Sequence, residues 1–377
     1  MSPASPTPPV GADAIALLER ARELAARVLA PAANTTDQAD SVPREHLRAL
    51  AGAGLLGIAT PARYGGLGAP ARVAREVLEI LAGACGVTAF VQMQHATAAC
   101  PLIARGDNEA LKERVLPRLA SGERLCTVGF SHVRRPGPPM VRIEPDGDDV
   151  RLHGTVPWLT GHGIADDAVI AGTLPDGRLM YVLTPLSAGD SIEASPPLRL
   201  SAMNASATVS LTLRALRVGP EQVIATATRE QQAARDVAGL LTPAALSLGA
   251  AGAAAALLAS LAERRGEAQL AGAARALEDE REAARAEVNA WADQPEAEGY
   301  AEHAVRARAS CVELGVRAAH AAVAATGGSA NRLDNAAQRL FREAMLYSLT
   351  AQTRDLQAAT VQRLLGRGAG AMDRARP

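Results

Sequence analysis

The chain has few aromatic residues and no excess of charge of either sign. Aromatic side chains make up 2% of its 377 residues, so any hydrophobic core must be built largely from Ala, Leu and Val. There are 39 basic and 40 acidic residues, which gives a formal net charge of -1. This balance provides no electrostatic attraction for a nucleic-acid backbone or an anionic membrane, so we expect neither as a partner.

Cysteine is scarce as well. The four cysteines are scattered and form no CxxC pair. This argues against a disulfide or zinc framework, and no metal site is expected. Residues 1–9 are rich in Pro and Ser and lack a basic region followed by an apolar core, so they are not read as a signal peptide. We therefore expect a reducing, cytoplasmic location.

One long apolar run has to be tested as a membrane span. Residues 240–262 are rich in Ala and are followed at once by Glu263, Arg264 and Arg265. The run is only mildly apolar, so we expect a helix packed inside a bundle.

Apolar periodicity divides the chain into three regions and a tail. Residues 1–122 have helical spacing. In residues 123–222, short apolar runs alternate with turn signals such as PDGD at 145–148, which predicts an antiparallel β domain. Residues 223–366 return to helical spacing and predict a four-helix bundle, and residues 367–377 are expected to form a flexible tail. The expected fold class is therefore mainly α with a central antiparallel β domain.

Four phrases occur in a characteristic order: GLLGIATP at 54–61, YGGLG at 64–68, LPRLASGE at 116–123 and WLTGHG at 158–163. Their order resembles the acyl-CoA dehydrogenase superfamily of flavoproteins, which also includes flavin-dependent monooxygenases. The family has the same succession of helices, sheet and helix bundle. The resemblance implies FAD as the cofactor, with FMN as the alternative.

The resemblance also implies which residues contact the flavin. In the family a Trp-x-Thr phrase lies beside the isoalloxazine, so Trp158 would pack on the ring and Thr160 would hydrogen-bond near N5. The alternative is that Trp158 fills a junction between sheet and helices. Ser131 stands where a family Thr faces the flavin pyrimidine, or it merely ends a strand. Gly327 and Gly328 resemble a loop that approaches a neighbouring subunit's cofactor, although Gly is also a common helix C-cap.

Several catalytic parts of the family pattern are missing. Ordinary members remove the α-proton of an acyl thioester with a carboxylate, and this chain has Ala351 at the usual position of that base. A subset carries its Glu on the first long bundle helix, where this chain has Gly239, with Asp236 three residues away. The family's CoA-holding Gly-Ser-Asp is replaced by RRPGPP at 134–139, and the Arg loop that touches a neighbour's FAD is shortened to ERRGE at 263–267.

His95 is the candidate catalytic residue. Several flavin-dependent monooxygenases place a His near the flavin on an N-terminal helix, and His95 fits that position. An imidazole changes its charge near neutral pH, which suits it to moving protons. The alternative is a half-buried helix histidine whose hydrogen bonds are satisfied. The family's second His, late in the chain, is not found near Ala351.

Three hypotheses follow. The first is a flavin-dependent oxidoreductase, monooxygenase-like, that uses reduced flavin and oxygen on a small-molecule substrate other than an acyl-CoA, with a flavin reductase as an optional partner. The second is an acyl-CoA dehydrogenase with a relocated base. The third is a non-catalytic binding or scaffold protein of the same fold. The resemblance implies a homodimer or homotetramer, because the family's Gly-Gly loop approaches the cofactor of a neighbouring subunit.

Overall fold

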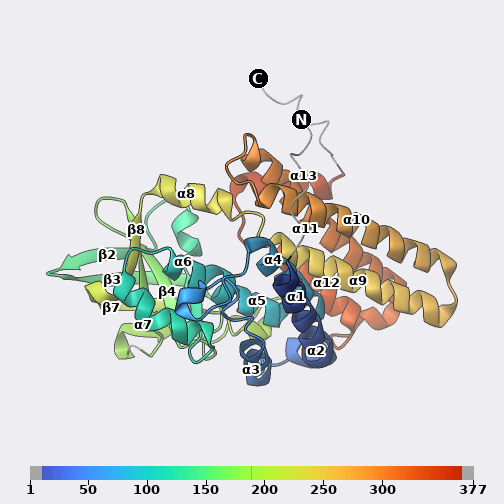
Figure 1. The fold of residues 1–377 in the computed structure, drawn as a ribbon, viewed down its shortest axis with the longest axis horizontal. Helices are drawn as coiled ribbons and strands as arrows, with labels where there is room; N and C mark the ends of the chain where they lie inside the picture. The colour runs from blue at the N-terminus through green and yellow to red at the C-terminus, as the bar shows by residue number, and fades with distance from the viewer. Residues whose placement is uncertain (1–10, 188, 367–377) are drawn as a thin grey trace. The chain divides into compact units, whose positions relative to one another are not determined.

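The computed structural model describes residues 11–187 and 189–366 (Figure 1). The tail predicted at 367–377 lies outside these residues. Contacts between Cα atoms group the chain into two compact units. Of the described residues, the sheet unit consists of those in Leu17–Ala74 and Val87–Arg235, and the bundle unit consists of those up to Ala16, those in Arg75–Gly86 and those from Asp236 on.

Helices precede the sheet, as the apolar spacing predicts. Two of them continue through π-helical segments, η1 and η3, which the sequence did not reveal. In chain order these elements are α1 (Ala12–Leu24), η1 (Ala25–Leu29), α2 (Ala30–Asp37), α3 (Arg44–Gly52), α4 (Ala71–Ala84), α5 (Gly86–Met93), η3 (Gln94–Ala99), α6 (Cys100–Ala104) and α7 (Glu109–Ala120).

The strands form one sheet in the order β6-β7-β3-β2-β4-β5-β8, and β1 pairs with β4. The sheet is mixed, which corrects the expectation of an antiparallel domain: β1 and β2 both run parallel to β4. The β2–β3 hairpin reverses the chain before β4 begins, so β4 regains the direction of β1. The strands are β1 (Cys126–Gly129), β2 (Val141–Asp146), β3 (Asp149–Leu159), β4 (Asp167–Thr173), β5 (Leu179–Pro185), β6 (Ile192–Ala194), β7 (Val209–Val218) and β8 (Val223–Ala227).

The central strand β4 is buried on both faces, which explains its continuous apolar sequence. Val169 and Ala171 belong to one core cluster, with side chains of α6 and α7, whereas Ala168 and Ile170 belong to a second cluster built from β2, β3 and β7. Successive side chains of β4 thus point alternately into two hydrophobic cores, one on each face of the sheet.

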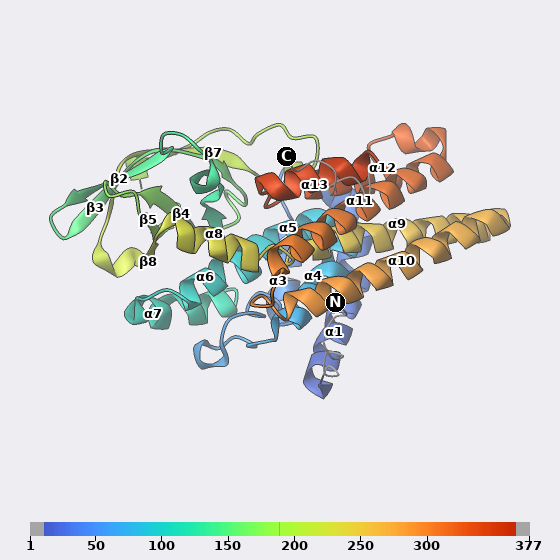
Figure 2. The same cartoon turned by 90° about the horizontal axis from the view of Figure 1, so that it is seen from above.

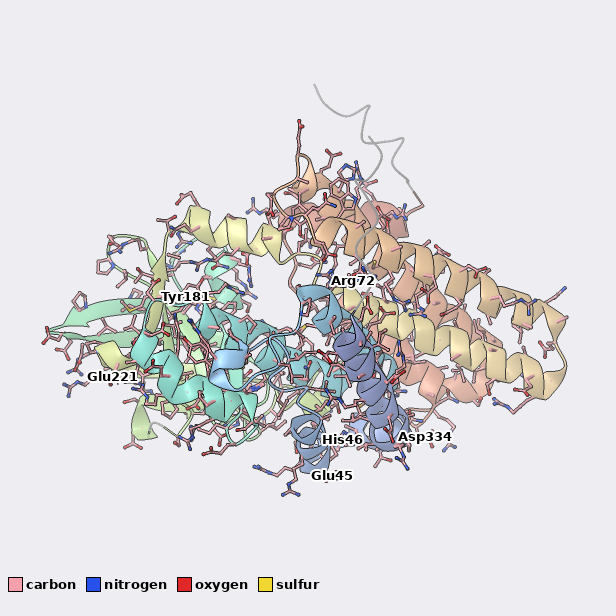
Figure 3. All side chains as sticks on the ribbon, viewed as in Figure 1. Glu45, His46, Arg72, Tyr181, Glu221 and Asp334 are labelled. Atoms are coloured by element: carbon pink, nitrogen blue, oxygen red, sulfur yellow. The ribbon has the colours of Figure 1, made fainter. Side chains whose placement is uncertain are left out.

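Tyr181 joins β5 to the helix that follows the sheet. Tyr181 is labelled among the side chains of the sheet unit in Figure 3, and its side chain is fully buried. Its hydroxyl donates to Gln232 Oε1 at 2.5 Å. Gln232 lies on α8 (Arg229–Ala238). The return to helix thus comes at Arg229, after β8 and a few residues beyond the predicted boundary at 222.

Long helices dominate the bundle unit and pack side by side (Figure 2). The apolar spacing predicts a first bundle helix over Glu230–Glu263 and a last one over Asn335–Leu365, and each of them is divided in two. The first is divided between α8 and α9 around residues 239–243, and the last at 348–353, where Ala351 has φ 49° and Thr353 caps the next helix. The helices are α9 (Ala244–Arg265), α10 (Ala268–Ala292), α11 (Tyr300–Thr326), α12 (Ala336–Tyr347) and α13 (Arg354–Leu364).

Helix α9 is the apolar run that was tested as a membrane span. By length and composition alone it could cross a membrane, but 67% of its most apolar window is buried inside the protein. Buried core helices have the same composition. Its packing is close: a Cβ on Gly249 would lie 2.5 Å from the carbonyl oxygen of Glu79, so only glycine fits there.

Candidate functional site

Trp158 and Ser131 lie on neighbouring elements of the sheet unit. Trp158 is the penultimate residue of β3, and Ser131 begins the short helix η4 (Ser131–Arg134) that follows β1. The end of β1 packs on β3 so closely that a Cβ on Gly129 would lie 2.9 Å from Val156 Cγ1. The Trp158 residue is 44% exposed, and Ser131 is exposed as well. An exposed indole and an exposed hydroxyl are thus carried by β3 and η4, two elements that contact each other.

Thr160, just after β3, is held by a chain of hydroxyl groups. Its Oγ1 is 3.2 Å from Thr208 Oγ1, and Thr208 Oγ1 is 2.7 Å from Ser206 Oγ. The Thr160 carbonyl accepts a hydrogen bond of 2.6 Å from Thr127 Oγ1, which ties the end of β3 to β1. A hydroxyl can donate one hydrogen bond and accept two, so Thr160 retains capacity for a further partner.

His95 is buried, and both of its ring nitrogens are engaged. Nδ1 accepts from the backbone N–H of Cys126 at 3.0 Å, which leaves Nε2 as the protonated nitrogen that donates to the carbonyl of Leu119 at 3.1 Å. Burial lowers the pKa of His95 to about 4, so the ring stays neutral near pH 7. These contacts disfavour the predicted proton transfer and favour the alternative, a histidine that ties the π-helical segment to α7 and β1.

A small cavity lies between His95 and Thr160. Counted as the space open to the centre of a water molecule, its volume is about 10 Å³. A cavity of this volume has room for about one water, so it cannot hold a flavin ring. Any ring that contacts Trp158 must lie on the exposed side of the indole.

Gly327 and Gly328 end α11 in the bundle unit. Gly327 has φ 79° and ψ -156°, and a Cβ at either position would meet nothing within 4 Å. Arg265 Nη1 donates to the carbonyl of Ala325 at 2.8 Å, which holds the end of α9 against the end of α11. The loop is exposed and sterically open, so another molecule's backbone or phosphate could approach it.

The segment expected to carry a catalytic base is the loop between α12 and α13. Its residues 348–353 read SLTAQT, and Ala351 is exposed. On α12, Glu343 is buried and forms an ion pair of 3.0 Å with Arg339. Asp236 is half-buried on α8 and has a partner within the protein.

Sequence reasoning missed the side chains that support the candidate residues. Thr127 and Thr208 bond to Thr160, and Gln92 lines the cavity with its amide nitrogen donating to the carbonyl of Leu55 at 2.9 Å. These residues are far from Thr160 in sequence and belong to no motif, so no local pattern could have identified them. In residues 11–187 and 189–366, no group of three or more His, Cys, Asp or Glu side chains could bind a metal.

The sequence has recognisable relatives. Residues 12–123 match the family described as acyl-CoA dehydrogenase, N-terminal domain. A probable acyl-CoA dehydrogenase of Mycobacterium leprae is 34% identical over 160 residues, and this match spans 41% of each chain, so it covers well under half of that relative's length. A probable acyl-CoA dehydrogenase of Bacillus subtilis is 25% identical over 372 residues, which is 92% of this chain and 96% of the relative.

Solved structures share the whole fold. Butyryl-CoA dehydrogenase from Megasphaera elsdenii has a TM-score of 0.83 at 19% identity, covering 96% of this chain and 100% of that one. Dibenzothiophene monooxygenase from Paenibacillus sp. A11-2 has a TM-score of 0.78 at 17% identity, covering 93% of this chain and 97% of that one. At such identities the similarity establishes the fold, and it confirms the expected fold class except for the mixed pairing of the central sheet.

Proposed function

We propose that the chain is a flavin oxidoreductase of the acyl-CoA dehydrogenase superfamily and that it uses reduced flavin and oxygen on a small-molecule substrate other than an acyl-CoA. Both dehydrogenases and a monooxygenase share this fold, so the fold alone leaves the reaction open. The reaction has to be argued from the residues of the site.

The observation that carries the proposal is the α12–α13 loop. Dehydrogenation of an acyl thioester needs a base for the α-proton. Among residues 348–353 no side chain is a carboxylate, and Ala351 stands where the resemblance expects the base. The nearby carboxylate of Glu343 is buried and paired with Arg339. Oxygen chemistry needs no such base, so this loop favours it.

The side chains fit a flavin. The exposed indole of Trp158 offers an apolar wall, and the hydroxyls of Ser131 and Thr160 offer hydrogen bonds for the polar edge of the ring. The sterically open loop at Gly327 and Gly328 would approach the cofactor of a neighbouring subunit. When bound, the flavin supplies the electrons that reduce oxygen.

We propose that the cofactor is FAD, as the resemblance implies. We propose further that the protein is a homodimer or homotetramer, and that a flavin reductase is a candidate source of the electrons.

The proposal is tested on the purified protein loaded with FAD or FMN. Under anaerobic conditions, butyryl-CoA is expected to leave the visible absorbance of the bound flavin unchanged, because no base removes its α-proton. After reduction with dithionite, the same protein is expected to be reoxidised by dissolved oxygen. Bleaching by butyryl-CoA would instead support a dehydrogenase, and failure to take up either flavin would support a scaffold protein.

Trp158→Ala is expected to weaken flavin binding about 5- to 30-fold, equivalent to about 1–2 kcal/mol for the loss of an aromatic stacking surface. The dissociation constant is measured by titrating the apoprotein with FAD and following flavin fluorescence. Trp291→Ala is the matched control, because Trp291 stacks on His303 in the bundle unit, with ring centroids 3.9 Å apart. Equal flavin affinity in wild type and Trp158→Ala would show that Trp158 is purely structural.

A further inference from the structure

The turn at residues 203–207 holds the segment that follows β3. Met203 and Ala207 have φ 63° and 47°, a left-handed conformation that residues other than glycine rarely adopt. Such strained residues persist where the surrounding structure imposes them, and they cluster at functional sites. Here the carbonyl of Ser206, within the turn, accepts the backbone N–H of Gly161 at 2.7 Å. The strained turn is thus bonded to the segment that carries the candidate flavin residues.

Three hydroxyl groups form a chain from this turn to Thr160. Ser206 Oγ is 2.7 Å from Thr208 Oγ1, which is 3.2 Å from Thr160 Oγ1. All three residues are buried, and Ser206 is 0% exposed. Among residues 11–187 and 189–366, neither Ser206 Oγ nor Thr160 Oγ1 has a hydrogen-bond partner other than Thr208. The chain of hydroxyls therefore has a closed end at Ser206.

The number of protons fixes the direction of this chain. A hydroxyl has one proton to donate and can accept two hydrogen bonds. If Thr208 donated to Ser206, the Ser206 proton would be buried without an acceptor, which is unfavourable. Ser206 therefore donates to Thr208, and Thr208 donates to Thr160. Because the Thr160 oxygen accepts within the chain, its own proton points to an acceptor outside the chain.

We propose that Ser206 and Thr208 are positioning residues that fix the Thr160 hydroxyl as a hydrogen-bond donor to the bound flavin. The inference rests on the proposed function, because it needs a flavin beside Thr160. It goes beyond that function by giving a role to two residues outside the Trp-x-Thr phrase. Ser206 and Thr208 act only through Thr160, and no covalent step is involved.

A fixed donor distinguishes the two oxidation states of the flavin. The resemblance places Thr160 near N5, which accepts a hydrogen bond in the oxidised ring and carries a proton in the reduced ring. The Thr160 hydroxyl thus stabilises oxidised flavin more than reduced flavin. This difference lowers the reduction potential of the bound flavin and makes the reduced form a stronger reductant for oxygen.

Neutron diffraction tests the direction of the hydroxyl chain without any flavin. In crystals of the wild-type protein exchanged into deuterium oxide, we expect the deuterium between Ser206 and Thr208 to be bonded to Ser206 Oγ. The deuterium between Thr208 and Thr160 is expected on Thr208 Oγ1. A deuterium on Thr160 Oγ1 that points to Thr208 would overturn the proposal.

The midpoint potential of the bound flavin tests the role of the chain. Thr208→Val removes the hydroxyl and nearly keeps the shape of the side chain, so the Thr160 proton is no longer held in one direction. We expect the preference for oxidised over reduced FAD to fall about 3- to 10-fold, which raises the two-electron midpoint potential by about 15–30 mV. Thr208→Ser keeps the hydroxyl and is expected to retain the wild-type potential.

Thr212→Val is the matched control for this measurement. Thr212 is half-buried on β7, the strand that begins just after Thr208, and its side chain has no hydrogen bond to Thr160. We expect this variant to have the wild-type potential. Equal potentials in wild type and Thr208→Val, or the same shift in Thr208→Val and in Thr208→Ser or Thr212→Val, would refute the positioning role.

The two proposals fail in distinguishable ways. If the wild-type protein takes up no flavin, or if its flavin is bleached by butyryl-CoA or is not reoxidised by oxygen, the proposed function is wrong, whatever the deuterium positions show. If oxygen reoxidises the wild-type flavin and Thr208→Val leaves its potential unchanged, the hydroxyl chain does not position Thr160 and the proposed function stands.

Discussion

Replacing Glu79 by alanine is expected to lower the free energy of unfolding of the bundle unit by about 3–5 kcal/mol, the usual effect of removing one partner from a buried ion pair. Glu79 lies on α4, and its buried carboxylate accepts hydrogen bonds from Arg285 Nη2 at 2.6 Å and Arg285 Nε at 2.9 Å, and from Arg281. The variant would leave two largely buried guanidinium groups without this carboxylate. The hydrogen bonds that Glu79 accepts raise the pKa of Arg285 above its ordinary value, and the variant loses this stabilisation of the guanidinium charge.

Glu282→Gln is the matched control for this prediction. Glu282 contacts the same two arginines, Arg281 at 3.1 Å and Arg285 at 2.5 Å, but its side chain is 54% exposed. Solvent screens such a pair, so we expect a loss of about 1 kcal/mol or less. Both variants are unfolded in urea in a Trp158→Phe background, where the fluorescence of Trp291 on α10 reports on the bundle unit. Equal losses in the two variants would contradict the buried-charge argument.

Replacing Gly154 by alanine is expected to cost the sheet unit about 3 kcal/mol or more, or to prevent its folding. Gly154 lies on β3, between β2 and β7, at an irregularity in the β3–β7 register. Its φ is 126°, a conformation that side chains rarely adopt, and a Cβ there would lie 1.9 Å from the carbonyl oxygen of Met140. Relief requires that β2 and β3 separate, which breaks the pairing of Val141 with this position.

Gly147→Ala separates the effect of backbone conformation from that of the clash. Gly147 turns the same β2–β3 hairpin with φ 64°, and a Cβ there would meet nothing within 4 Å. Alanine at position 147 is therefore destabilising only because it must adopt a left-handed backbone conformation, which costs about 1–2 kcal/mol. Urea unfolding of both variants is followed by Trp158 fluorescence in a Trp291→Phe background. If Gly154→Ala were no less stable than Gly147→Ala, close approach of the strands would not be the reason for glycine at 154.

Much of the fold could be predicted because its signals are local. Helical spacing before residue 122 and after 228, and short apolar runs with turn signals between them, indicate the succession of helix, sheet and helix. The division of the last predicted helix was missed, because residues 348–353 contain no Pro or Gly that would mark a break. The parallel pairing of β1 with β4 was also missed, because it depends on the path of the intervening hairpin and no short pattern encodes it.

In the candidate site too, some residues could be predicted from the sequence, whereas their contacts could not. Trp158 and Thr160 were found from a contiguous phrase, and the structure places Ser131 on an element next to them. For His95, both a catalytic and a structural role were open, since one histidine on a helix has no pattern that reveals its partners. Its bonds to Leu119 and Cys126 come from segments 24 and 31 residues away.

The sequence alone determined the order of the elements, the resemblance to the acyl-CoA dehydrogenase superfamily and the absence of a carboxylate in residues 348–353, since each of these can be read from neighbouring residues. Tertiary structure alone decided that His95 is held neutral, that Glu79 binds two arginines some 200 positions away, and that a small cavity lies beside Thr160. Charge state and empty space depend on what surrounds a side chain in three dimensions, and those surroundings come from distant parts of the chain.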